Sequence, residues 1–88
     1  MAETDQATRD ALATLADLAQ GDSGGSSAAR SMLVYAWDTS QPIYRFADLS
    51  GRHRVAALVI LNRAWAINPD AIESIAPQVR RWHQVQTT

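Results

Sequence analysis

The sequence predicts an all-α protein, a small bundle of about four helices around a central apolar helix at residues 50–67. Two observations lead to this prediction. Apolar residues recur at three- and four-residue spacing through most of the chain, which is the period of an amphipathic helix. The run from Val55 to Leu61 has no polar side chain, and a helix that is apolar all round needs partners on several sides. With 88 residues we expect one domain over 1–88, with a frayed tail at 84–88.

The composition excludes several classes of protein. A formal net charge of -1 argues against a protein that binds nucleic acid through its net charge alone. The chain has no cysteine, which excludes disulfides and thiolate chemistry. The acidic N-terminus lacks the basic segment and apolar run of a signal peptide, and the central apolar run is too short to span a membrane. We therefore expect a cytoplasmic protein with no membrane contact.

The first helix is predicted to begin at Thr4 or Asp5, either of which can cap it. Its apolar positions follow the spacing of one helical face: Ala7, Ala11, Leu12, Leu15, Leu18 and Ala19. Gly21 is predicted to end the helix in a left-handed conformation.

The segment from Gly21 to Gly25 spells Gly-Asp-Ser-Gly-Gly, the sequence around the nucleophile of chymotrypsin-like serine proteases. The chain is too short for the two barrels of that fold, and both histidines follow the serine instead of preceding it. We interpret the segment as a turn between helices, in which glycines adopt positive φ and Asp22, Ser23 or Ser26 caps the next helix. Binding of an anion by the free amides is the weaker alternative.

The second helix is predicted from apolar residues that share one face: Ala29, Met32, Leu33, Ala36 and Trp37. A hairpin within residues 32–46 is the competing interpretation, because this stretch contains a nearly continuous apolar run and Pro42. The helix is preferred because the preceding serines and alanines favour helical geometry. Tyr44 and Phe46 are expected to close one end of the core.

Two further helix starts are predicted. Asp48 or Ser50 begins the central helix, and Asn68-Pro69-Asp70 combines a capping side chain, a proline at the first helical position and an acid in the first turn. Pro77 predicts a kink, or a short helix followed by a second one. The residues predicted to lie in or near the core are Leu15, Leu33, Trp37, Val55, Leu58, Val59, Leu61, Ile72 and Val79.

Several of these residues also form a shared pattern. The pattern consists of Leu15, Leu18-Ala19-Gln20-Gly21-Asp22-Ser23-Gly24, Ser26, Leu33, Trp37, Phe46, Asp48-Leu49, Pro69-Asp70, Val79-Arg80 and Trp82. In these residues, and most of all in the Leu-Ala-Gln-Gly-Asp-Ser-Gly turn, the chain resembles a family of short uncharacterised proteins encoded on plasmids and integrative elements of proteobacteria. It departs from that family in lacking a second Trp beside Trp37, in a shorter link before Phe46 and in the missing acids of the central helix. The resemblance implies an all-helical accessory protein of mobile DNA, with no activity to carry over.

No catalytic residue, metal ligand or cofactor is expected. His53 and His83 have neither the spacing to each other nor the acidic neighbours of a metal site. The carboxylates lie mostly at predicted helix starts, where capping accounts for them. The three Trp residues lie at spacings that point into a bundle.

We therefore expect a non-enzymatic protein-interaction module. Its candidate surface is the arginine- and aromatic-rich set Arg52, Arg54, Arg63, Arg80, Arg81 and Trp82, because Arg and Trp are enriched at the energetic centres of interfaces. As a mobile-element accessory protein it would bind a host or element-encoded protein, and an anti-defence, anti-CRISPR-like inhibitor is one form of this role. Self-association as a homodimer is a further candidate. The alternative is a small DNA-binding regulator that uses the same arginines on phosphates, but nucleic acid is the less favoured partner because the net charge is low and Lys is absent.

Overall fold

A computed structural model of the chain describes residues 5–87, in which every regular element is helical. The elements are α1 (Gln6–Leu18), α2 (Gly24–Trp37), the short 3-10 helix η1 (Phe46–Asp48), α3 (Gly51–Arg63), the 3-10 helix η2 (Ala64–Ala66), α4 (Pro69–Ile75) and α5 (Val79–Thr87). The predicted all-α class is confirmed. The competing hairpin is wrong, because α2 is helical through Trp37.

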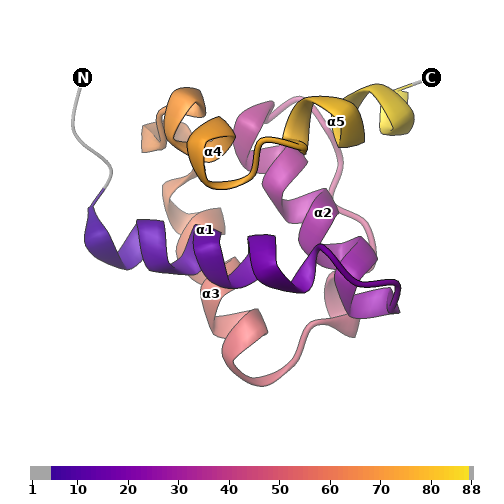
Figure 1. The fold of residues 1–88 in the computed structure, drawn as a ribbon. Coiled ribbons are helices and arrows are strands. Elements are labelled where there is room, and N and C mark those ends of the chain that lie inside the picture. Colours follow the sequence, from indigo (N-terminus) through magenta and orange to yellow (C-terminus); the bar gives the residue numbers. More distant parts are fainter. Residues whose placement is uncertain (1–4, 88) are drawn as a thin grey trace.

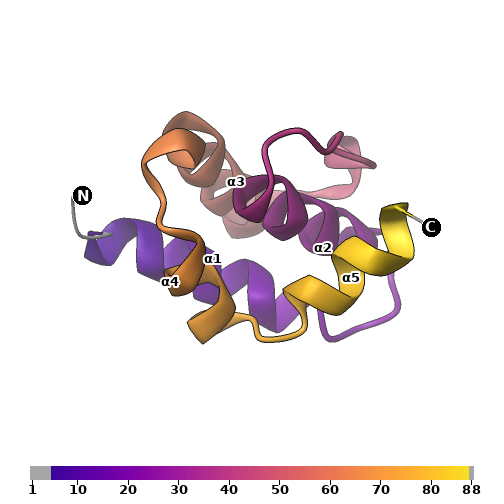
Figure 2. The same ribbon diagram turned by 90° about the horizontal axis from the view of Figure 1, so that it is seen from above.

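The helices form a layered bundle in which α1 crosses α2 and α3, while α4 and α5 lie along one edge (Figures 1 and 2). The molecule extends over 33 × 31 × 19 Å. Since a helix with its side chains is about 10 Å across, the shortest dimension holds about two helices. A helix in such a molecule has an uncovered side unless it lies at the junction of the others.

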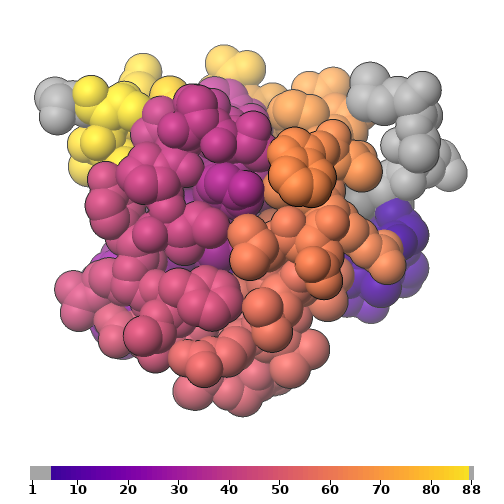
Figure 3. Space-filling model, turned by 180° about the vertical axis from the view of Figure 1, so that it is seen from behind, coloured from indigo at the N-terminus to yellow at the C-terminus, as the bar shows by residue number. Residues whose placement is uncertain are grey.

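The helix at that junction is α2, and the prediction that residues 50–67 form the centre is wrong. α2 contacts every other helix, and its buried residues are Ser26, Ala28, Ala29, Ser31, Met32, Leu33, Val34 and Ala36. Its small side chains let neighbouring backbones approach from several directions. α3 ends at Arg63 and buries only Ala56, Ala57 and Ile60, because it packs on α1 and α2 from one side and its outer side is open to solvent. Seen from behind, the segment around α3 forms a continuous part of the surface (Figure 3).

The residues predicted to lie in or near the core are confirmed on α1, α2, α4 and α5, and in part on α3. Leu15, Leu33, Ile72 and Val79 are fully buried, and Trp37, Val59 and Leu61 are partly buried and pack against them. Val55 and Leu58 are exposed, so their assignment to the core is wrong. Both lie on the side of α3 that no other helix covers.

Side-chain caps begin the first two helices as predicted. The Asp5 carboxylate accepts a hydrogen bond from the Thr8 backbone N–H at 2.8 Å, and the Ser23 hydroxyl accepts one from the Ser26 N–H at 3.1 Å. Each cap satisfies one of the backbone donors that a helix start leaves without an intrahelical partner. Thr4, the other candidate cap, lies outside the described residues.

Positive φ angles occur at positions other than those predicted. Gly21 does not adopt one, and the residue that ends α1, Ala19, is right-handed. Gly21 is required for space, since a Cβ there would lie 2.8 Å from the Ser26 hydroxyl oxygen. Within residues 5–87, positive φ occurs at Gly51 (56°) and at Arg45 (58°).

The C-terminal third follows the predicted break. The Asn68 side chain accepts a hydrogen bond from the Asp70 N–H at 2.9 Å, and α4 stops before Pro77. α5 then continues through Thr87 where a frayed tail was predicted, and Gln86 donates to the Gln41 side-chain oxygen at 3.3 Å. Thr88 lies outside the described residues.

Candidate functional site

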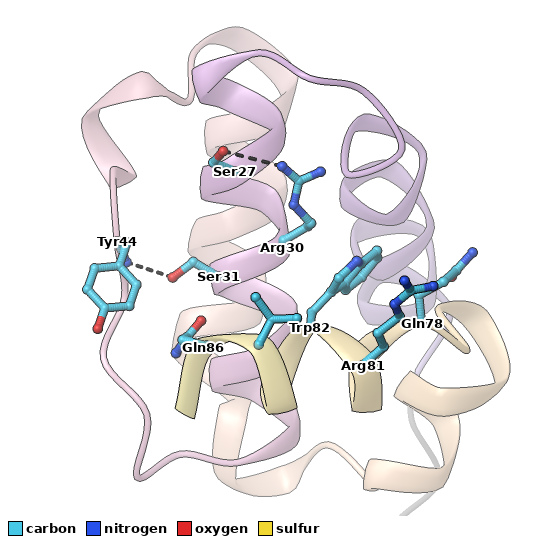
Figure 4. Close-up of a pocket in the computed structure, with 9 residues that line it drawn as sticks. Ser27, Arg30, Ser31, Tyr44, Gln78, Arg81, Trp82 and Gln86 are labelled. Carbon is cyan, nitrogen blue, oxygen red and sulfur yellow. Dashed lines mark hydrogen bonds between the residues drawn. The ribbon is translucent and has the colours of Figure 1, made fainter. Parts of the chain in front are cut away.

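A groove of about 380 Å³ lies between α2, α5 and the segment 42–45 (Figure 4). Its lining residues are Ser27, Arg30, Ser31, Tyr44, Gln78, Arg81, Trp82, Val85 and Gln86. Tyr44 stands at one end of the groove, and Gln78 and Arg81 stand at the other (Figure 4). The volume is near the lower end of the range of about 300–1,000 Å³ for ligand sites, which suits a few side chains or a small molecule.

One wall of the groove is a face of α5. Pro77 cannot continue α4, so the chain turns and starts α5 at Val79, whose fully buried side chain anchors the helix. Trp82, Val85 and Gln86 follow at three- and four-residue spacing and therefore share a face. Trp82 is partly buried and packs against the core, whereas Val85 is exposed.

A polar contact fixes α5 against the end of α2. His83 Nε2 lies 2.9 Å from Asp38 Oδ2, and the His83 ring meets the Trp37 ring edge-on with centroids 5.1 Å apart. The Ser40 hydroxyl donates to the Asp38 carboxylate at 2.6 Å. These hydrogen bonds, from Ser40 first and then from His83, lower the pKa of Asp38 to about 2. The carboxylate is thus held ionised at the point where the two helices meet.

The Tyr44 end of the groove depends on a backbone contact. The Tyr44 N–H donates to the Ser31 hydroxyl at 2.6 Å, and the same hydroxyl lies 3.5 Å from the Pro42 carbonyl. Arg45 then adopts a left-handed conformation that turns the chain between two aromatic residues. Phe46 packs against the core, and Tyr44 is left exposed beside the groove. The prediction that both close the core is right for Phe46 only.

The two cations of the groove differ in their availability. Arg30 donates to the carbonyls of Ala19 at 2.7 Å and Gly21 at 3.0 Å, so its charge already complements the C-terminal end of α1. Arg81 forms no hydrogen bond or ion pair with the residues the structure describes. Its guanidinium is therefore available to an anionic group of a ligand.

The lining residues provide binding contacts. None of the nine is a carboxylate, an imidazole or a thiol, so no general base lies in the groove beside the hydroxyls of Ser27 and Ser31. The groups available to contact a ligand are the aromatic faces, two side-chain amides and the guanidinium of Arg81. This set suits recognition of a group that is partly apolar and partly anionic.

The six residues predicted as one interaction surface lie in separate places. Arg81 and Trp82 line the groove, whereas Arg80, their neighbour on α5, forms an ion pair with Glu73 of α4. The three arginines of α3 lie apart from these, because α3 and α5 do not contact each other within residues 5–87. The six residues are therefore spread over two helices that do not contact each other in this part of the chain.

The α3 arginines have three different roles. Arg63 forms an ion pair with Asp5, which ties the end of α3 to the start of α1. Arg54 donates to the Leu49 carbonyl at 2.9 Å and lies over the Phe46 ring. Arg52 is exposed and has no partner among the described residues.

The prediction from sequence missed most of the groove. Val85 belongs to the stretch predicted as a frayed tail, although its three-residue spacing from Trp82 was a signal that the helical face continues. Tyr44 was assigned to the core. The hydrogen bonds of Arg30 and Ser31 could not be predicted from the sequence, because each joins two segments that come close only in the folded chain.

Comparison of the chain with models of protein families, with curated proteins and with solved structures gives no match in any of the three. Within residues 5–87 no helix is both long and apolar enough to cross a membrane. In the same part of the chain, no three His, Cys, Asp or Glu side chains gather in a way that suits a metal ion.

Proposed function

We propose that the protein is a non-enzymatic protein-interaction module whose groove between α2 and α5 binds a short segment of a partner protein. The observation that carries the proposal is the combination of exposed apolar side chains with an available cation. Tyr44 and Val85 are 50% and 72% exposed beside the groove, Trp82 lines it, and Arg81 is unpaired among residues 5–87. Aromatic residues and arginine are enriched where protein interfaces hold most of their binding energy.

The groove chemistry defines the partner segment. An apolar side chain of the partner removes the exposed surface of Tyr44 and Val85 from water. A carboxylate toward the other end pairs with Arg81, whose planar guanidinium suits bidentate contact. We therefore propose a segment that carries an apolar residue followed or preceded closely by Asp or Glu.

The resemblance to proteins of plasmids and integrative elements extends the proposal to the origin of the partner. We propose a host or element-encoded protein, with an anti-defence inhibitor as one form of the role. The placement of the arginines does not favour the DNA-binding alternative, because Arg63 and Arg80 are paired with acids and Arg54 with backbone carbonyls.

The test is selection of a random peptide library on the immobilised wild-type protein, followed by affinity measurement with labelled peptides. The groove variants are Val85→Asp and Arg81→Glu. The matched controls are Val55→Asp and Arg52→Glu, an exposed valine and an unpaired arginine on α3. We expect selected peptides to combine an apolar residue with a nearby acid, and each groove variant to weaken binding at least about tenfold while the controls bind as the wild type does.

Failure to enrich any peptide, or equal losses in groove and control variants, would contradict the groove proposal. Fluorescence anisotropy on duplex and single-stranded DNA separates the alternative, with an Arg80→Ala, Arg81→Ala double variant as the probe of the cations. Phosphate binding weakens steeply with rising salt. Micromolar DNA binding at physiological salt that the double variant loses would favour the regulator instead.

A further inference from the structure

The groove is small compared with a helix that would lie in it. Its volume is about 380 Å³, between α2, α5 and the segment 42–45 (Figure 4). A helix with its side chains is about 10–12 Å across, whereas neighbouring extended chains lie only about 5 Å apart. A helical partner would therefore rest on the rim and insert a few side chains. An extended segment would bring its backbone to the lining residues as well.

We infer that the partner segment binds in an extended conformation, with its apolar residue and its acid two positions apart. This inference rests on the proposed function. Arg81 and Val85, the available cation and the exposed apolar residue of the α5 wall, are four positions apart and share a face of the helix. Their positions therefore differ by about 6 Å along α5. In an extended chain, residues two positions apart point to the same side and are separated by about 6.6 Å.

The polar groups of the groove favour an extended segment over a helix, which would match the same 6 Å with residues about four positions apart. The Gln78 side chain is exposed at the Arg81 end and forms no hydrogen bond within residues 5–87. The Ser27 hydroxyl accepts a hydrogen bond from Arg30 at 3.3 Å, and its own hydrogen has no acceptor in the same part of the chain. An extended segment presents backbone N–H and C=O groups that need such partners, whereas a helix satisfies its own.

The conformation sets which spacings the groove recognises. Side chains one or three positions apart lie on opposite sides of an extended chain, so only one of the two enters the groove. Side chains four positions apart lie on the same side but are separated by about 13 Å, roughly twice the distance between Arg81 and Val85 along α5. A spacing of two is therefore the one that places the apolar side chain and the carboxylate on their partners together.

The test uses fluorescein-labelled synthetic peptides of about twelve residues, long enough for either conformation. Each peptide carries one Leu and one Glu in an Ala and Ser background, at spacings from one to four and in both orders. Fluorescence anisotropy with the wild-type protein should give the lowest dissociation constant at a spacing of two, at least about tenfold below the other spacings. Strongest binding at three or four would indicate a helical partner and overturn the inference, as would equal binding at every spacing.

The backbone contact is tested with Gln78→Ala, which should weaken binding of the spacing-two peptide at least about threefold. The matched control is Gln6→Ala, an exposed glutamine at the start of α1, which should bind as the wild type does. Unchanged affinity in Gln78→Ala, or no binding by any peptide of the series, would also overturn the inference. The proposed function fails by different results: no enrichment from the random library, or losses in Val85→Asp and Arg81→Glu that their controls share.

Discussion

Replacing Ile60 and Leu58 by alanine, one at a time, compares two apolar residues that lie two positions apart on the same helix. Ile60 is fully buried between α3 and its neighbours, whereas Leu58 is 46% exposed on the open side. Truncation of a buried Ile or Leu removes its transfer free energy and leaves a cavity, for a total of about 2–5 kcal/mol. At Leu58 about half of the side chain is already in water and no closed cavity remains. Full burial of such a side chain contributes about 1.5–3 kcal/mol, so about half of this, roughly 0.8–1.5 kcal/mol, is the expected loss.

Chemical denaturation measures both losses in the free energy of unfolding. In thermal unfolding each kcal/mol should appear as a shift of about 4–8 °C for a domain of this size. Ile60→Ala should thus remove a large share of the roughly 5–15 kcal/mol that stabilises a typical domain. Equal losses at the two positions, or a larger loss at Leu58, would refute the one-sided packing of α3 and restore the centre of the bundle to residues 50–67.

Three smaller predictions follow from single contacts. Ser23→Ala should lower the free energy of unfolding by about 0.5–2 kcal/mol, because its hydroxyl caps α2 at the Ser26 N–H, and a fluorophosphonate probe should not label Ser23 in the wild type. Gly51→Ala should lower it by about 1–2 kcal/mol through backbone strain alone, since φ is 56° and a Cβ would meet no atom within 4 Å; an unchanged midpoint in urea would refute this. Because the pKa of Asp38 is lowered, its contribution to the free energy of unfolding is fully present above about pH 4 and is lost as the pH falls toward about 2. Asp38→Asn should therefore flatten the acid limb of the curve of stability against pH, without raising the midpoint of unfolding at neutral pH.

Local chemistry made much of the fold predictable. The caps at Asp5, Ser23 and Asn68 and the break at Pro77 each depend on a few adjacent residues, and the structure confirms them. Three- and four-residue spacing identified the faces of α1 and α2 for the same reason. These features are set by backbone hydrogen bonding within one helical turn.

The centre of the bundle was not predictable from apolar content. The run from Val55 to Leu61 is more continuously apolar than α2, yet α2 occupies the junction because its small residues, such as Ala28 and Ala29, admit neighbours on several sides. Burial depends on which elements surround a helix, and that is a property of the whole fold. The groove was missed for the same reason. It exists only because α5 returns across α2 beside a loop that Ser31 holds in place.

The groove and the exposed side of α3 lie on helices that do not contact each other within residues 5–87, since α5 packs on α2 and α4 while α3 packs on α1 and α2. This separation makes Val55→Asp a matched control for Val85→Asp, because both place a carboxylate at an exposed valine and only Val85 lines the groove. A loss of peptide binding in Val85→Asp that Val55→Asp does not share therefore belongs to the groove, and equal losses would refute the groove as the binding site.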